Sequence, residues 1–252
     1  MNVLVSRRSW ALAPVLFVLM SLCLLGVWAV MEPEALRAAF DEDGYSFFET
    51  LTLPFYALIV PLVWLCCPFT GPRRRQVLLS LAVSCVAAMA IVKQLDLHVA
   101  AISALYPDVV ANFKGTPFKM RFLTGSGIPV GAKLFALAYF VLFFGTFAGL
   151  LAYFAKALWK GFFSLHPVAW SVCFLGGSGV MVQVFDRLPA WWRHLKGLPK
   201  ERAVDAVSSF CTAFEEGGEM MLAVFALVAI LQSYLLNVRP TEGATYDIGA
   251  GR

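Results

Sequence analysis

The protein has 252 residues, of which 60% are hydrophobic and 14% are charged, and its formal net charge is +4 at pH 7. A soluble globular protein is about half apolar and about a quarter charged, so this composition excludes a soluble enzyme and predicts a protein of the lipid bilayer. Because a membrane-spanning helix needs ~20 residues, the chain has room for about five to seven spans. We therefore expect a single integral membrane domain over residues 1–252.

Windows that lack Asp, Glu, Lys and Arg mark the spans, because a charged side chain at the centre of a bilayer costs at least ~2.5 kcal/mol. The windows are continuous apolar runs rather than alternating ones, which favours helices over a barrel. The sequence thus predicts an all-α fold, a polytopic transmembrane helical bundle of about six spans. In chain order, the spans cover approximately residues 10–31, 49–69, 76–96, 133–156, 165–186 and 206–236.

Two of these spans have features of their own. Arg7 and Arg8 precede the first span, as in a cleaved signal peptide, but its apolar run is longer than the ~7–15 residues of a signal core, which favours a retained span. In the fifth span, the run Gly176-Gly177-Ser178-Gly179 is typical of a close helix contact, since small residues let helix backbones approach one another in lipid.

Basic residues in the short connections predict the orientation. Arg7 with Arg8, the run from Arg73 to Arg75, and Lys156 with Lys160 all fall on one side of a six-span bundle, which should be the cytoplasmic side. Both termini should then be cytoplasmic. The outer connection from Arg187 to Arg202 also holds five Lys and Arg residues, which favours the opposite orientation. The tight Arg73 to Arg75 turn weighs more, because the rule applies best to short connections.

Charged residues from four different spans lie at one predicted depth. Counted at ~1.5 Å per helical residue from the cytoplasmic end of each span, they lie ~22 to ~28 Å into the membrane, at its outer edge. Two pairs also share a helix face, because Lys93 and Asp96 are three residues apart and Glu215 and Glu219 are four apart. This polar belt consists of Glu49, Lys93, Asp96, His98, Asp186, Arg187, Glu215, Glu216 and Glu219.

An ionisable group inside a span is a functional candidate by default. Glu215 and Glu219 fit this description best, because apolar sequence continues on both sides of them. Three acids within five residues repel one another, so some must meet cations or share protons. His98 should titrate near neutral pH if it is solvated. The alternative for Asp96 and for the Asp186-Arg187 pair is a role as interfacial anchors.

The longest connection, residues 99–132, holds a second candidate site. Its cations, Lys114, Lys119 and Arg121, alternate with phenylalanines, and this alternation suits phospholipid headgroups. An ordinary interfacial loop has the same composition, which is the alternative interpretation. The six cysteines fall within predicted spans and none has the spacing of a zinc site, so the sequence predicts no cofactor and leaves metal ligands open.

Four short motifs carry a family resemblance. They are Glu42-Asp43-Gly44 with Glu49, Lys93-x-x-Asp96-x-His98, Phe118-Lys119-x-Arg121-Phe122 and Glu215-x-x-x-Glu219. Together they resemble an uncharacterised group of bacterial multi-pass inner-membrane proteins, over most of the chain. The resemblance implies a helical multi-pass architecture in the bacterial inner membrane and no particular chemistry.

Two classes of function follow from these residues. In the first, the polar belt is a site open to the periplasm that binds a cation, a proton or a lipid headgroup, for transport, sensing or support of an envelope complex. The alternative is a membrane-embedded metal-dependent hydrolase acting on a lipid or an amide, somewhat similar to the seven-span metal-dependent membrane amidases. Only His98 among three histidines is well placed to hold zinc, which favours binding over catalysis. The expected partners are membrane lipids, a small cation or lipid ligand and another membrane protein, and no nucleic acid.

We expect Glu219 to pair with Lys93 in the bundle interior. Breaking one partner of a buried pair typically costs ~3–5 kcal/mol, whereas removing both can be close to neutral. Glu219→Gln and Lys93→Met should therefore each lower the thermal unfolding temperature in detergent, and the double variant should recover much of the loss. If the two losses simply add, the residues are not partners, and Arg187 becomes the expected partner of Glu219.

Overall fold

The computed structural model describes residues 9–40, 46–112, 120–196 and 206–238. Within these ranges the regular elements are all helices. Six helical segments are long and apolar enough to cross a membrane, which confirms the predicted all-α, polytopic bundle. They are Ser9–Val30, Phe47–Cys66, Arg73–Gln94, Val130–Phe163, Pro167–Trp192 and Ala206–Asn237.

The chain divides into two compact units. The first unit joins Met1–Thr70 to Ala155–Arg252, and the second unit is Gly71–Phe154. The first unit therefore combines the two ends of the sequence, and the middle of the sequence forms the second.

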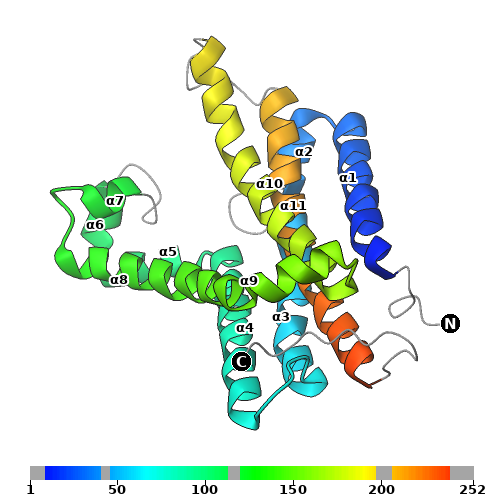
Figure 1. Cartoon of the computed structure of the whole chain (residues 1–252). Helices are drawn as coiled ribbons and strands as arrows, with labels where there is room; N and C mark the ends of the chain where they lie inside the picture. Colours follow the sequence, from blue (N-terminus) through cyan, green and yellow to red (C-terminus); the bar gives the residue numbers. More distant parts are fainter. Residues whose placement is uncertain (1–8, 41–45, 113–119, 197–205, 239–252) are drawn as a thin grey trace. The chain divides into compact units, whose positions relative to one another are not determined.

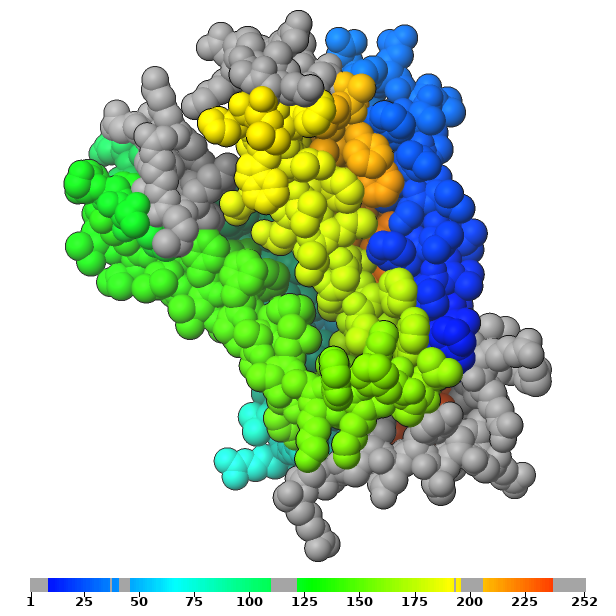
Figure 2. Space-filling view, turned by 45° about the horizontal axis from the view of Figure 1, so that its top comes forward, coloured from blue at the N-terminus to red at the C-terminus, as the bar shows by residue number. Residues whose placement is uncertain are grey.

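In the first unit, one helix contacts most of the others (Figure 1). The helices of this unit are α1 (Leu12–Val30), α2 (Pro33–Phe40), α3 (Phe47–Cys66), α10 (Pro167–Lys196) and α11 (Ala206–Val238). Helix α11 contacts α1, α2, α3 and α10. In the space-filling view, part of α11 is visible between α10 and α1, which both contact it (Figure 2). The last predicted span is therefore the central helix of the unit.

The core of the first unit forms where α1, α10 and α11 meet. Met221 and Phe225 of α11 are four residues apart, share one helix face and are fully buried. The Phe225 ring lies 5.9 Å from the Phe174 ring of α10 and 6.5 Å from the Phe17 ring of α1, measured between centroids. Because lipid tails are as apolar as these side chains, close packing rather than water exclusion holds such helices together.

The second unit contains one long span and a group of shorter helices. They are α4 (Arg73–Gln94), α5 (Leu97–Leu105), α6 (Pro107–Asn112), α7 (Met120–Thr124), α8 (Val130–Phe140) and the first part of α9 (Thr146–Phe163). A separate core forms around Ile102, Phe122, Ile128, Ala132 and Ala136. Between α8 and α9, residues Val141–Gly145 form a π-helical turn, so the fourth span is continuously helical.

Some helices extend beyond the predicted spans. Helix α10 continues to Lys196, although the sequence predicted a connection from Arg187 onward. A charge marks the edge of a membrane window, but it does not end a helix. Helix α3 ends at Cys66 because Cys67 adopts a left-handed conformation, with φ of 40°.

Glycines allow α11 to pack closely against two neighbours. A Cβ atom on Gly217 would collide with the Leu24 side chain of α1, and one on Gly218 would lie 2.7 Å from Val182 Cγ2 of α10. On α10, a Cβ on Gly179 would lie at an ordinary distance, 3.6 Å, from the Leu222 side chain, whereas Gly176 and Gly177 have open space around them. In the glycine run of α10, the contact with α11 is therefore made near Gly179, at an ordinary van der Waals distance.

The substitution Gly218→Ala tests this packing. Val182 is β-branched and has one strongly preferred rotamer in a helix, so it has little freedom to move away from the added methyl group. Overpacking of this kind costs ~1–3 kcal/mol, and we expect a lower thermal unfolding temperature in detergent. Gly177→Ala is the matched control, because the same change into open space should be neutral or slightly stabilising. Equal effects of the two substitutions would contradict the close contact.

Candidate functional site

The acids of α11 and its glycines lie on different sides of the helix. At 3.6 residues per turn, Glu215 and Glu219 are about 40° apart around the helix axis, and Glu216 is about 60° from Glu219. Gly217 and Gly218 lie about 160° and about 100° from Glu219 around the axis, and they contact α1 and α10. The sequence Glu-Glu-Gly-Gly-Glu therefore places small residues, which pack against neighbouring helices, and three acids within five consecutive residues of one helix.

Glu219 is the most buried of the three acids. Its side chain is 6% exposed, whereas Glu215 and Glu216 are half-buried. Phe214 and Met221, on either side of it in the sequence, are themselves buried. This burial confirms that apolar helix continues on both sides of the acids.

Tyr56 of α3 completes the surroundings of Glu219. Its hydroxyl donates a hydrogen bond to the backbone carbonyl oxygen of Glu219, with an O···O distance of 3.0 Å. Tyr56 is 8% exposed, so the contact joins α3 to α11 inside the unit. We call Tyr56, Glu215, Glu216 and Glu219 the acidic site.

Glu49 has a structural role at the start of α3. One of its carboxylate oxygens accepts a hydrogen bond from the Ser46 backbone N–H at 2.9 Å, and its own N–H donates to the Ser46 hydroxyl at 3.2 Å. This reciprocal capping box satisfies two N–H groups at the helix end. Glu49 also precedes Tyr56 by seven residues, which places both on one face of α3. It therefore sets where α3 begins, and Tyr56 lies two turns further along.

Asp186 and Arg187 lie on an exposed part of α10, about ten residues before its end, and pair with each other. Arg187 Nε donates to Asp186 Oδ2 at 3.0 Å, and the two side chains are 65% and 46% exposed. Exposed pairs of this kind contribute little to stability. The arrangement is the one expected of interfacial anchors.

Lys93, Asp96 and His98 belong to the second unit, where they build the turn between α4 and α5. Asp96 adopts a left-handed conformation with φ of 47°, and its carbonyl oxygen accepts the N–H groups of Val99 and Ala100 at 2.9 Å. The side chains of Lys93 and Asp96 are exposed. The expected pairing of Lys93 with Glu219 stays a prediction.

His98 is buried rather than solvated. Its Nδ1 lies 3.3 Å from the Val92 carbonyl oxygen, and because a carbonyl only accepts, this nitrogen carries the hydrogen. The imidazole stacks on the Tyr139 ring of α8 with centroids 5.1 Å apart, and the Tyr139 hydroxyl donates to the Met89 carbonyl oxygen at 3.4 Å. Burial lowers the pKa of His98, so the condition of solvation, under which it was expected to titrate near neutral pH, is not met.

The second candidate site lies outside the described residues. Lys114 and Lys119 fall within residues 113–119, and Arg121 belongs to α7, with its side chain also outside the description. Their predicted contact with lipid headgroups therefore stays a prediction. Within the described ranges, no three His, Cys, Asp or Glu side chains are placed to hold one metal ion. The hydrolase alternative stays untested.

Sequence reasoning missed a buried polar cluster at the other end of α11. Gln232 is fully buried, accepts a hydrogen bond from the Ser171 hydroxyl at 2.7 Å and donates to the Ser9 carbonyl oxygen at 3.4 Å. The Ser233 hydroxyl donates to the Pro68 carbonyl oxygen at 2.6 Å. Tyr56 was missed as well, although its spacing from Glu49 was readable as a shared helix face. Neutral polar residues within a span give a weak signal, since only the fold shows what they meet.

Comparison of the chain with protein-family models, with curated proteins and with solved structures finds no match. The resemblance to bacterial multi-pass inner-membrane proteins therefore stays a prediction, and the functional argument depends on the geometry of the sites themselves.

The lowered pKa of His98 predicts how stability depends on pH. The folded protein holds this histidine neutral, while the unfolded chain protonates it with an ordinary pKa of ~6.5. Stability should therefore be complete above that pH and should fall as the pH drops from ~6.5 through the lower pKa of the folded state. His98→Phe, which keeps a ring for stacking, should flatten this dependence in thermal unfolding, whereas the exposed control His194→Gln should not. An unchanged pH dependence in His98→Phe would contradict the burial of a neutral imidazole.

Proposed function

We propose that this integral membrane protein binds a proton or a small cation at the acidic site, with Glu219 as the central ligand. The observation that carries the proposal is the burial of Glu219, at 6% exposure, within an apolar helix that holds two further acids. A carboxylate in such surroundings is stabilised by protonation or by a positive charge. A site of this kind suits ion transport, sensing or ion-dependent support of a membrane complex.

The neighbouring groups support a binding site rather than an isolated buried acid. Glu215 and Glu216 are half-buried beside Glu219, so negative charge is concentrated where solvent access begins. Like charges on adjacent carboxylates favour a small cation between them, because its binding reduces their repulsion. The Tyr56 hydroxyl holds the Glu219 backbone from α3 and keeps the acids in place. In the predicted topology, the site lies near the periplasmic edge of the bacterial inner membrane.

Binding should appear as ligand-dependent stability of the purified protein. A ligand at one hundred times its dissociation constant stabilises the folded state by ~2.7 kcal/mol. We therefore expect the thermal unfolding temperature in nanodiscs to rise on titration with protons or with one of sodium, potassium, magnesium or calcium. Glu219→Gln should abolish this rise, because the amide neither gains a proton nor attracts a cation.

The matched control is Asp186→Asn, which neutralises an exposed acid of the same unit. It should leave the ligand-dependent rise intact. A difference infrared spectrum separates the two ligands, because only proton binding produces the band of a protonated carboxyl group. Identical titrations of the wild type and Glu219→Gln would contradict the proposal, whichever ligand was used.

A further inference from the structure

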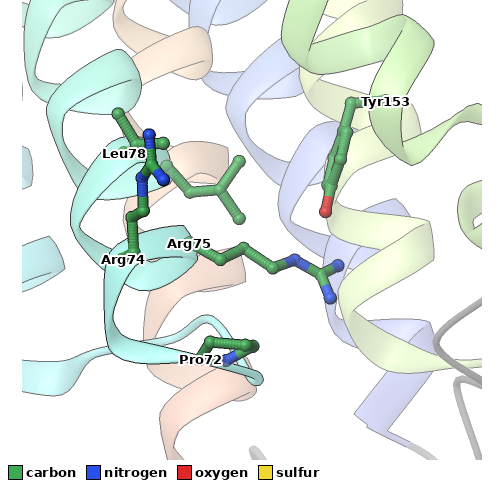
Figure 3. A pocket seen from close by; sticks show the side chains of 6 residues that line it. Pro72, Arg74, Arg75, Leu78 and Tyr153 are labelled. Atoms are coloured by element: carbon green, nitrogen blue, oxygen red, sulfur yellow. The ribbon is translucent and has the colours of Figure 1, made fainter.

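A pocket of about 340 Å³ opens at the start of α4, within the second unit (Figure 3). It is lined by Pro72, Arg74, Arg75, Leu78, Leu79 and Tyr153. The accessible wall of the pocket is mainly apolar, Arg75 extends toward Tyr153, and Arg74 points along α4 beside Leu78 (Figure 3). None of these residues belongs to the acidic site.

Arg75 is held across the pocket by its neighbours. Its guanidinium carbon lies 5.2 Å from the centroid of the Tyr153 ring, a cation–π contact (Figure 3). Gly71, with φ of 115°, brings the preceding turn against the Arg75 side chain, where a Cβ would lie 3.3 Å from Arg75 Cδ and Nη1. An arginine held on both sides loses little further freedom when it binds a ligand.

Arg75 has an unused hydrogen-bond donor. Its Nε is buried and has no hydrogen-bond partner among the described residues. A guanidinium stays charged at all relevant pH values and offers only donors. Because Nε itself has no accessible surface, a ligand in the pocket would meet the outer part of the guanidinium, and it must supply an anionic or strongly accepting oxygen.

The start of α4 adds to the positive potential. No side chain caps this helix end and its first turn contains no acid, while Arg73 and Arg74 are exposed there. The N-terminus of a helix carries a partial positive charge and exposes N–H groups, which favours phosphate. The arginine pair and the helix end thus favour the same kind of ligand.

The apolar wall of the pocket favours a phospholipid over a free phosphate ion. Leu78 and Tyr153 are 57% and 52% exposed on the sides of two predicted spans, so the wall continues onto surface that faces acyl chains. A free phosphate ion would leave this wall unused, whereas a phospholipid places a phosphate at the arginines and its chains along the leucines. On the side predicted to be cytoplasmic, anionic lipids are the available phosphates of this kind.

We propose that this pocket binds a phosphate group, carried by an anionic phospholipid, with Arg74 and Arg75 as its anion ligands. The site is independent of the acidic site, and it predicts that lipid binding follows particular arginines rather than the total charge of the turn. Tyr153 is a positioning residue, because it holds the Arg75 guanidinium by its ring.

The test measures lipid retained by the full chain in nanodiscs of phosphatidylcholine mixed with phosphatidylglycerol, using native mass spectrometry after transfer to detergent. Loss of any cation near an anionic membrane surface lowers binding about fivefold, and loss of a charge-assisted hydrogen bond to the phosphate lowers it further, so Arg74→Gln and Arg75→Gln should each reduce retained phosphatidylglycerol by more than about tenfold. Arg73→Gln is the matched control, since it removes the same charge from the same turn but does not line the pocket. It should show only the general loss of about fivefold.

Two further variants keep the proposal testable if Arg75→Gln folds poorly. Arg75→Lys preserves the charge but loses the planar fork of donors, and Tyr153→Leu preserves the apolar wall but releases the guanidinium. Both should weaken retention. Equal loss in Arg73→Gln, or no loss in any pocket variant, would overturn the pocket as the site.

A second arm distinguishes the two sources of phosphate. Inorganic phosphate is titrated into delipidated protein, and the thermal unfolding temperature is followed. A small or absent rise, together with arginine-dependent retention of phosphatidylglycerol, supports the phospholipid. A large arginine-dependent rise without lipid retention overturns the phospholipid as the ligand and assigns the phosphate site to a soluble phosphate.

Discussion

The close approach of α1 and α10 to α11 is the constraint on which the first unit depends. In lipid, helices associate through close packing and polar contacts, because the surrounding chains are as apolar as the helix surfaces. Gly217 and Gly218 provide this closeness, since the Leu24 and Val182 side chains occupy the space that a larger residue would fill. Helix geometry then leaves the adjacent acids on the other side of α11. One dipeptide therefore determines both the packing of the unit and the direction of its charged face.

Burial gives the acids of α11 their importance. Glu219 is almost fully enclosed, whereas Asp186 is exposed and compensated by its sequence neighbour Arg187. The two carboxylates lie at similar predicted depths, so depth alone does not distinguish them. The enclosing helices do, because the cost of an ionised group rises as its contact with water falls. Under the proposed function, the stability of the fold and the affinity for a positive ligand are coupled at Glu219.

Helix α4 shows a different use of polar groups at each of its ends. At its start, three arginines follow one another, and Arg75 lies beside an apolar wall with its Nε buried and unsatisfied among the described residues. At its end, His98 and Asp96 satisfy backbone groups and make the turn into α5. The first set of groups is the one that we propose for an anionic ligand, whereas the second is directed to backbone groups of the unit.

The sequence by itself determined the fold class and the six spans, because the cost of placing each residue in lipid depends on that residue and its immediate neighbours. It also determined the stripe of acids in the last span, since helical spacing is local. The capping role of Glu49 was readable from Ser46-x-x-Glu49, although depth suggested a place in the belt. Only the tertiary structure decided that Tyr56 meets the Glu219 backbone, that His98 is buried against Tyr139 and that Arg75 lies beside Tyr153. These contacts join residues tens of positions or more apart in the sequence. They depend on which helix faces pack together, and the sequence of one helix does not determine that.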